Sequence, residues 1–316
     1  MKVIEHIEKA TETLFTYEIV PPPRGRSLKD VLEIVEKLAV YNPKWIDVTS
    51  HSSGAYYKER PDGTVDRIIQ KKRPGTIGIC GLIQNQFNID TVPHLLCQGF
   101  TREETEDALI ELNYLGIENI LALRGDGVNY DKKHPSGKST NQYATDLVEQ
   151  VSNIRKAKYL EEIKKPQSID FCVGVAGYPE KHFEAPNLAS DIEKLKIKVD
   201  AGAHYITTQM FFNNQAFFDF VKTCREAGIT VPIIPGLKVL KRAKHLETLP
   251  KFFFLDFPDE LAAQVKKDPE HAEEIGYEWT CKQVEELLDF GVPSIHFYVM
   301  NDTETVTKVV EKFQHL

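Results

Sequence analysis

Glu18 is the side chain of this sequence that is best placed to carry acid–base chemistry. It lies in the apolar segment 14–20, where β-strand alternation puts Thr16 and Glu18 on one face and bulky apolar side chains on the other. A carboxyl group held away from water there would have a raised pKa and could act as a general acid near neutral pH. From its position alone, a structural ion pair with a lysine or an arginine explains Glu18 equally well.

A short segment after another apolar run combines three residue types that suit contact with a ligand. Arg124 is a bidentate hydrogen-bond donor, Gly125 allows close approach of the backbone, and Asp126 offers a fixed negative charge. A simple Gly-Asp-Gly turn explains this pattern equally well. His94 and Gln209, taken singly, are more typical of a hydrogen-bonded core histidine and an interior amide than of ligand-binding groups.

A third pattern follows the segment 177–182. Asp191, Lys194 and Lys198 are spaced three and four residues apart, so they share one face of a predicted helix. An acid and two cations beside the end of a strand could hold ribose hydroxyls and a pyrophosphate. Taken alone, the pattern is more typical of a solvated helix face.

The elements that must position these residues follow a repeated pattern. Four predicted helices end in a glycine and are followed at once by a β-branched or aromatic run, which predicts parallel strands with right-handed crossovers. The segment 101–104 has the form of a helix capping box. The glycines are Gly116, Gly202, Gly228 and Gly291, and the predicted strands are 14–20, 45–50, 90–97, 119–125, 169–177, 205–211, 231–237 and 294–300.

Strands that alternate with helices over this length predict an α/β fold, a (β/α)8 TIM barrel that forms a single domain over residues 1–316. No G-x-G-x-x-G follows a predicted strand, so a Rossmann fold lacks its fingerprint. We interpret the apolar run 76–83 as an insertion between the second and third strands. The active site of such a barrel lies at the C-terminal ends of its strands, where this sequence places Glu18, Thr49, His94, Asp126, Gln209 and Asn301.

The composition excludes several classes of function. The chain has 316 residues and a net charge of −8, which disfavours a surface that binds nucleic acid. Neither an apolar stretch long enough for a membrane span nor the apolar core of a signal peptide is found. The five cysteines include no C-x-x-C pair, which disfavours a metal site and a disulfide framework. We therefore expect a cytoplasmic protein that binds no nucleic acid, membrane or metal.

Ten short segments, spread in order along nearly the whole chain, together resemble the methylenetetrahydrofolate reductase family in its short bacterial form, which has the catalytic barrel only. Each segment is short, but the set is highly specific. The segments are Tyr17–Pro22, Asp47–Thr49, Pro93–Cys97, Ala122–Asp126, Gln142–Leu147, Gly177–His182, Lys198–Ala203, Ile206–Gln209, Ile234–Gly236 and His296–Tyr298.

The resemblance implies a non-covalent FAD and a ping-pong reaction in one-carbon metabolism. NADH or NADPH would reduce the flavin and leave. The substrate 5,10-methylenetetrahydrofolate would then bind the same face and accept hydride from flavin N5, giving 5-methyltetrahydrofolate for methionine biosynthesis. The resemblance also implies a homo-oligomer.

The resemblance assigns roles to individual residues. Glu18 would protonate the folate and promote opening of its five-membered ring to a 5-iminium cation, which Asp126 would stabilise. Gln209 would contact the pterin and the nicotinamide nucleotide, and Thr49 would contact the nucleotide. Contacts to FAD are implied for His94, Arg124, Gly125, Asp126, Tyr143, Ala144, Tyr178, His182, Asp191, Lys194 and Lys198.

Some positions depart from the family pattern. Asp302 stands where the family commonly has an arginine that reaches the folate tail, so the tail must be held in another way. His245 and Leu249 stand where a folate-contacting glutamine and an aromatic residue near the nucleotide are expected. The segment 50–53 also differs from the usual loop after the second strand.

Two alternative functions remain open on the sequence. Another barrel enzyme, such as an aldolase or a lyase, would normally have a Schiff-base lysine within a strand or a glycine-rich phosphate loop after the last strands. A non-catalytic flavin- or folate-binding homologue is compatible with the changes at Asp302 and His245, but the presence of Glu18, Asp126 and Gln209 counts against it.

Overall fold

Parallel strands close into a barrel in the computed structural model, which describes residues 1–52, 54–70, 73–125, 137–300 and 303–314. Each strand pairs with the next around the ring in the order β1-β10-β9-β8-β7-β6-β5-β2, which confirms the predicted (β/α)8 barrel of eight strands. The barrel strands are β1 (Leu14–Ile19), β2 (Trp45–Val48), β5 (Asp90–Leu96), β6 (Asn119–Leu123), β7 (Cys172–Gly177), β8 (Tyr205–Met210), β9 (Ile233–Leu237) and β10 (Ser294–Met300).

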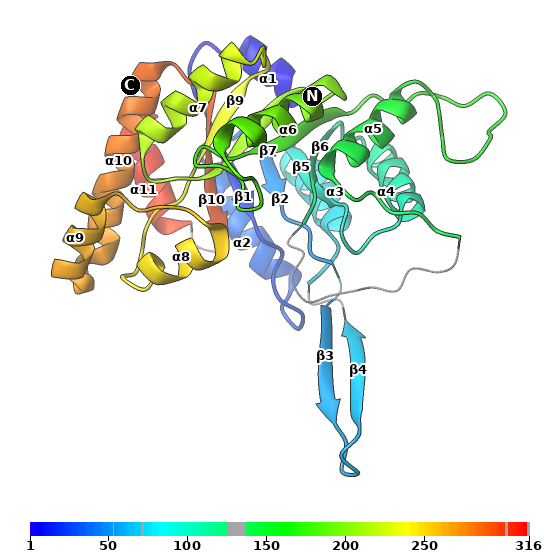
Figure 1. Cartoon of the computed structure of the whole chain (residues 1–316), viewed down its shortest axis with the longest axis horizontal. Coiled ribbons are helices and arrows are strands. Elements are labelled where there is room, and N and C mark those ends of the chain that lie inside the picture. Colours follow the sequence, from blue (N-terminus) through cyan, green and yellow to red (C-terminus); the bar gives the residue numbers. More distant parts are fainter. Residues whose placement is uncertain (53, 71–72, 126–136, 301–302, 315–316) are drawn as a thin grey trace.

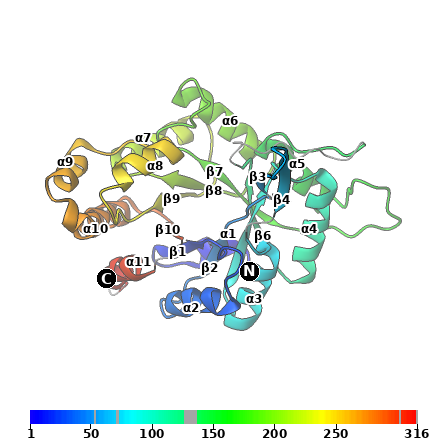
Figure 2. The ribbon, with the colours of Figure 1, turned by 90° about the horizontal axis from the view of Figure 1, so that it is seen from below.

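Helices surround the barrel (Figure 1, Figure 2). The predicted glycine stops are confirmed, because Gly116, Gly202, Gly228 and Gly291 all have the positive φ of a helix end. The helices that alternate with barrel strands are α2 (Leu28–Ala39), α3 (Thr76–Phe87), α4 (Arg102–Tyr114), α5 (Ala144–Arg155), α6 (Leu188–Asp200), α7 (Asn214–Glu226), α10 (Ala272–Phe290) and α11 (Glu304–Phe313). Further helices are α1 (Val3–Lys9), α8 (His245–Phe253), α9 (Asp259–Lys267) and the short 3-10 helix η1 (Pro269–His271).

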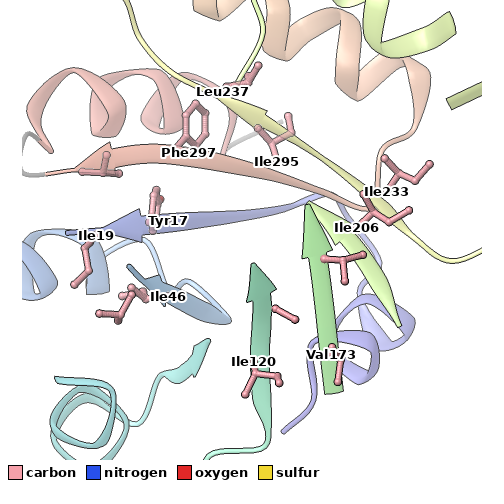
Figure 3. Close-up of a cluster of buried hydrophobic side chains, with 14 of the residues drawn as sticks. Tyr17, Ile19, Ile46, Ile120, Val173, Ile206, Ile233, Leu237, Ile295 and Phe297 are labelled. Carbon is pink, nitrogen blue, oxygen red and sulfur yellow. The ribbon is translucent and has the colours of Figure 1, made fainter. Parts of the chain in front are cut away.

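The main apolar core lies between the strands and the helices around them. Tyr17, Ile46, Val173 and Phe297 leave their strands on this outer side (Figure 3) and are buried in one cluster with helix residues such as Val35. Each fully buried side chain of this size contributes about 1.5–3 kcal/mol of transfer free energy. Alternation along the strands then directs their neighbours into the barrel.

The inside of the barrel is apolar at one end and polar at the other. Trp45, Leu121, Tyr205 and Ile234 form a separate buried cluster that includes Val3 of α1. The backbone N–H of Val3 donates to the side-chain oxygen of Asn119, at the start of β6, at 2.8 Å. Helix α1 therefore closes the N-terminal end, and the polar interior residues lie towards the C-terminal ends of the strands.

A hairpin of β3 (Gly54–Glu59) and β4 (Val65–Gln70) is added to the barrel pattern and extends away from the barrel (Figure 1). The prediction of an insertion at 76–83 was wrong in its place, because these residues begin α3, the helix between β2 and β5. Residues 76–83 are almost all apolar, and as part of this helix they pack into the core. Among the described residues, no helix is long and apolar enough to cross a membrane.

Helix α10 approaches the chain after β9 so closely that Gly276 has no room for a side chain. A Cβ at Gly276 would lie 1.8 Å from the carbonyl oxygen of Leu240, whereas a Cβ at Gly78 in α3 would meet no atom within 4 Å. We expect Gly276→Ala to lower the free energy of unfolding by about 1–3 kcal/mol through overpacking. Urea denaturation would measure this loss.

Gly78→Ala is the matched control. It is expected to leave stability unchanged or to raise it by up to about 1 kcal/mol, because alanine favours the helix. Equal effects of the two substitutions would contradict the close packing of α10.

Candidate active site

Glu18 lies inside the barrel near its C-terminal end and is only 9% exposed. In the strand register it stands beside Asp47 on β2 and Tyr298 on β10. The prediction that Thr16 and Glu18 point inward agrees with their contacts, because Thr16 Oγ1 lies 3.1 Å from His296 Nδ1 of β10. The carboxyl group is thus held in a packed, polar layer of the barrel.

His94 of β5 lies between two carboxyl groups. Its Nε2 is 3.6 Å from Glu18 Oε2 and 3.5 Å from Asp47 Oδ2. Both distances are at or beyond the limit of a hydrogen bond, so the interaction is mainly between charges. Burial lowers the pKa of His94, but the two nearby carboxyl groups outweigh it and leave the pKa above its usual value.

The pKa of Glu18 is raised to about 7. Burial is the main cause, because it disfavours the ionised carboxylate, and the charge of Asp47 acts in the same direction. His94 and Lys238 oppose the rise. A carboxyl group that titrates near neutral pH can deliver a proton under physiological conditions, so the surroundings of Glu18 suit a general acid.

Tyr298 stands beside Glu18 in the strand register. Its hydroxyl donates to the carbonyl oxygen of Thr208 at 2.7 Å, and Lys238 Nζ donates to the carbonyl oxygen of Tyr298 at 3.0 Å. A Cβ at Gly236 would lie 2.6 Å from the ring of Tyr298, so glycine on β9 makes room for that ring.

A second group of polar residues lies at the ends of β6 and β7. Arg124 follows β6 and forms a two-pronged ion pair with Glu184, in which Nη2 donates to Oε1 at 2.7 Å. Its guanidinium lies 6.0 Å from the ring centre of Tyr143, the N-cap residue of α5. Tyr178 and His182, after β7, meet edge to face with ring centres 4.8 Å apart.

Helix α6 adds a carboxylate and an ammonium group to this region. Asp191 Oδ2 accepts a hydrogen bond from the backbone N–H of His182 at 2.8 Å. Lys198 Nζ donates to the carbonyl oxygen of Ala176, on β7, at 2.6 Å. Burial lowers the pKa of Lys198 to about 8, against the opposing charge of Asp191. Lys194, predicted on the same face, is exposed.

The other predicted site residues lie at the same end of the barrel. Thr49 directly follows β2, and its buried Oγ1 has no hydrogen-bond partner among the described residues. Gln209, on β8, accepts a hydrogen bond from the backbone N–H of Met210 at 2.9 Å. Gly125 has a φ of +92°, and Ala144 is the first residue of α5. The predicted site residue Asp126, together with 301 and 302, lies outside the described residues.

The two residues of α8 that depart from the family pattern, His245 and Leu249, have different surroundings. His245 begins the helix, and its Nδ1 accepts a hydrogen bond from the backbone N–H of Lys241 at 3.3 Å. Leu249 is buried in an apolar cluster with Met210 and Leu255. Leu249 is therefore a buried core residue and does not replace the aromatic residue that the family has near the nucleotide.

Sequence reasoning assigned no role to Asp47, His296 or Tyr298. Two of the segments that carried the family resemblance contain these residues, and alternation along β2 and β10 could have placed them inside the barrel. Sequence reasoning also missed Glu180, whose pKa is raised to about 7 by burial and whose Oε2 accepts a hydrogen bond from the backbone N–H of Asp256. None of the barrel strands, all of whose residues are described, contains a lysine.

A family model described as methylenetetrahydrofolate reductase matches residues 2–314. This chain belongs to that family. The chain is 31% identical to 5,10-methylenetetrahydrofolate reductase of Buchnera aphidicola, over 97% of this chain and 95% of the relative. It is also 31% identical to methylenetetrahydrofolate reductase 1 of Schizosaccharomyces pombe, over 97% of this chain.

The chain spans 47% of the S. pombe methylenetetrahydrofolate reductase and about half of several other relatives from eukaryotes. Among solved structures, it is similar to a protein from Clostridium thermocellum that is described as binding two copies of 5-methyl-5,6,7,8-tetrahydrofolic acid. The TM-score is 0.60 and the identity 14%, over 99% of both chains. At that identity the likeness supports the barrel fold alone.

The raised pKa of Glu18 makes stability depend on pH. The folded protein holds the proton of Glu18 more tightly than the unfolded chain does. The stability that this proton contributes is complete below the usual pKa of 4.5 and is lost as the pH rises from there through about 7. Glu18→Gln cannot ionise and avoids this loss. Relative to the wild type, we expect its free energy of unfolding to gain about 2–3 kcal/mol between pH 5 and pH 8.

Urea unfolding of both proteins at the two pH values measures this difference. If the difference in the free energy of unfolding between the two proteins does not change with pH, Glu18 does not have the raised pKa assigned to it.

Proposed function

We propose that this chain reduces 5,10-methylenetetrahydrofolate to 5-methyltetrahydrofolate in a ping-pong reaction with NADH or NADPH and non-covalent FAD. The observation that carries the proposal is Glu18, a buried carboxyl group with a pKa of about 7 at the C-terminal end of a barrel of this family. Opening of the five-membered ring of the folate needs a proton donor beside the pterin, and general acids work best when their pKa is near the working pH.

The residues at the ends of β6 and β7 fit an FAD molecule. Arg124 and Lys198 supply positive charge for a pyrophosphate, and Tyr143, Tyr178 and His182 supply flat rings beside which planar groups can stack. Bound FAD would supply hydride transfer between the nicotinamide and the folate. The proposed contact residues are His94, Arg124, Gly125, Asp126, Tyr143, Ala144, Tyr178, His182, Asp191, Lys194 and Lys198.

The chain's own residues would prepare the folate for hydride. Glu18 would give the proton of its carboxyl group to the folate and promote opening of the five-membered ring to a 5-iminium cation. Asp126 would stabilise that cation by its negative charge, which acts strongly where water is excluded. Gln209 would orient the pterin and the nicotinamide nucleotide, and Thr49 would contact the nucleotide.

The colour of the purified protein separates this function from the alternatives. A yellow protein that releases FAD on denaturation supports the proposal, whereas a colourless protein that cannot retain added FAD refutes it. The absence of lysine from the barrel strands disfavours an aldolase that works through a Schiff base within a strand. Turnover separates the reductase from a non-catalytic homologue.

We expect Glu18→Gln to leave one half-reaction unchanged and to slow the other. We expect reduction of the flavin by NADH or NADPH to be retained, because it needs no proton from Glu18. Reoxidation by methylenetetrahydrofolate should be slowed by about 10²-fold or more, the range for loss of a general acid. Anaerobic stopped-flow absorbance measures both halves, and equal slowing of the two would refute the role of Glu18.

Lys198→Met should weaken FAD binding. Loss of one hydrogen-bonding charge costs roughly 1.5–3 kcal/mol, which corresponds to an affinity about 10- to 150-fold weaker. Because the pKa of Lys198 is about 8, wild-type affinity should also fall as the pH rises through that value. Fluorescence titration with FAD measures both effects.

Lys196→Met on the same helix is the control, since Lys196 forms an ion pair with Asp200. We expect it to leave FAD binding unchanged. Equal losses in the two variants would contradict the proposed contact.

A further inference from the structure

Two carboxyl groups share one imidazole inside the barrel. His94 Nε2 lies 3.6 Å from Glu18 Oε2 and 3.5 Å from Asp47 Oδ2. Asp47 is only 1% exposed, and its Oδ1 has no hydrogen-bond partner among the residues that the structure describes. A buried carboxylate with one oxygen lacking a hydrogen bond is stabilised by a nearby positive charge, and His94 is in position to carry that charge.

The other titratable groups around this layer do not replace His94. Burial keeps the pKa of Tyr205, Tyr298 and Cys80 high, so these groups are neutral near pH 7. His296 Nδ1 lies 3.8 Å from Asp47 Oδ1, but burial lowers its pKa despite the opposing charge of Asp47. Lys238, after β9, is the remaining cation that acts on Glu18.

The charge balance of the layer decides which group keeps a proton. If Asp47 is ionised and His94 is protonated, a neutral Glu18 leaves the three groups with no net charge. Ionisation of both carboxyl groups leaves these three groups with a net negative charge, which is unfavourable where there is little water. The charge of Lys238 opposes this effect but does not cancel it, because the pKa of Glu18 stays above its usual value.

We propose that Asp47 is a positioning residue that holds the charge of His94 and thereby leaves the proton on Glu18. The inference rests on the proposed function, in which that proton goes to the folate. Without Asp47, the imidazolium of His94 would have Glu18 as its remaining counter-ion in the layer. Glu18 would then ionise at neutral pH and could no longer act as an acid.

Asp47→Asn tests this role without relying on turnover. The carbonyl stretch of a protonated carboxyl group is followed by infrared spectroscopy as the pH is varied, and Glu18→Gln identifies the band of Glu18. We expect the midpoint for Glu18 to fall by about one pH unit or more in Asp47→Asn, because the imidazolium then pairs with Glu18 alone. An unchanged or higher midpoint would overturn the inference.

A second variant tests the same balance in the opposite direction. In His94→Gln the positive charge is removed while Asp47 remains, so the midpoint for Glu18 should rise. A fall, or no change, would contradict the proposal even if Asp47→Asn failed to fold. Asp90→Asn is the matched control, since Asp90 pairs with His6 at 2.7 Å at the other end of the barrel and should leave the midpoint of Glu18 unchanged.

The kinetic readout separates this inference from the proposed function. In Asp47→Asn, the pH profile of folate-driven reoxidation should move down with the infrared midpoint, while reduction by the nucleotide keeps its wild-type profile. A shifted infrared band in a protein that does not reduce folate would support the role of Asp47 and refute the proposed function. Folate reduction together with an unshifted infrared band would support the proposed function and refute the role of Asp47.

Discussion

The exclusion of water from one polar layer of the barrel is the constraint on which the candidate site depends. Glu18, Asp47 and His94 come from three strands and meet where solvent has almost no access. In water, charges at these separations would interact by only about 1 kcal/mol. Inside the barrel, where water is nearly absent, these interactions are stronger, and the pKa values of both Glu18 and His94 lie above their usual values.

That exclusion is achieved from several sides. The apolar cluster around Trp45 and helix α1 close the N-terminal end, and the outer core behind Tyr17 and Phe297 holds β1 and β10 together. Buried ionisable groups cost stability unless they are compensated. The apolar cluster at the N-terminal end and the outer core therefore have to supply the free energy that keeps the polar layer in place.

Local sequence patterns predicted what depends on one strand or one helix. Alternation was enough to direct Glu18 inward, and glycines such as Gly116 marked the helix ends correctly. The approach of His94 to Asp47 could not be predicted in this way, because it depends on the register between β2 and β5 around the closed ring. The run 76–83 was misplaced because a nearly uniform apolar segment has no period that separates a barrel helix from an inserted element.

The hairpin β3–β4 extends from the barrel and offers a place where a probe can be attached (Figure 1). Its turn lies between Arg60 and Thr64, where the backbone N–H of Arg60 donates to the carbonyl of Thr64 at 2.8 Å, far along the arm from the barrel (Figure 1). Exposed turn tips tolerate the insertion of whole domains whose own ends lie close together. A fluorescent reporter placed at Gly63 would therefore sit outside the barrel, at the far end of this hairpin (Figure 1).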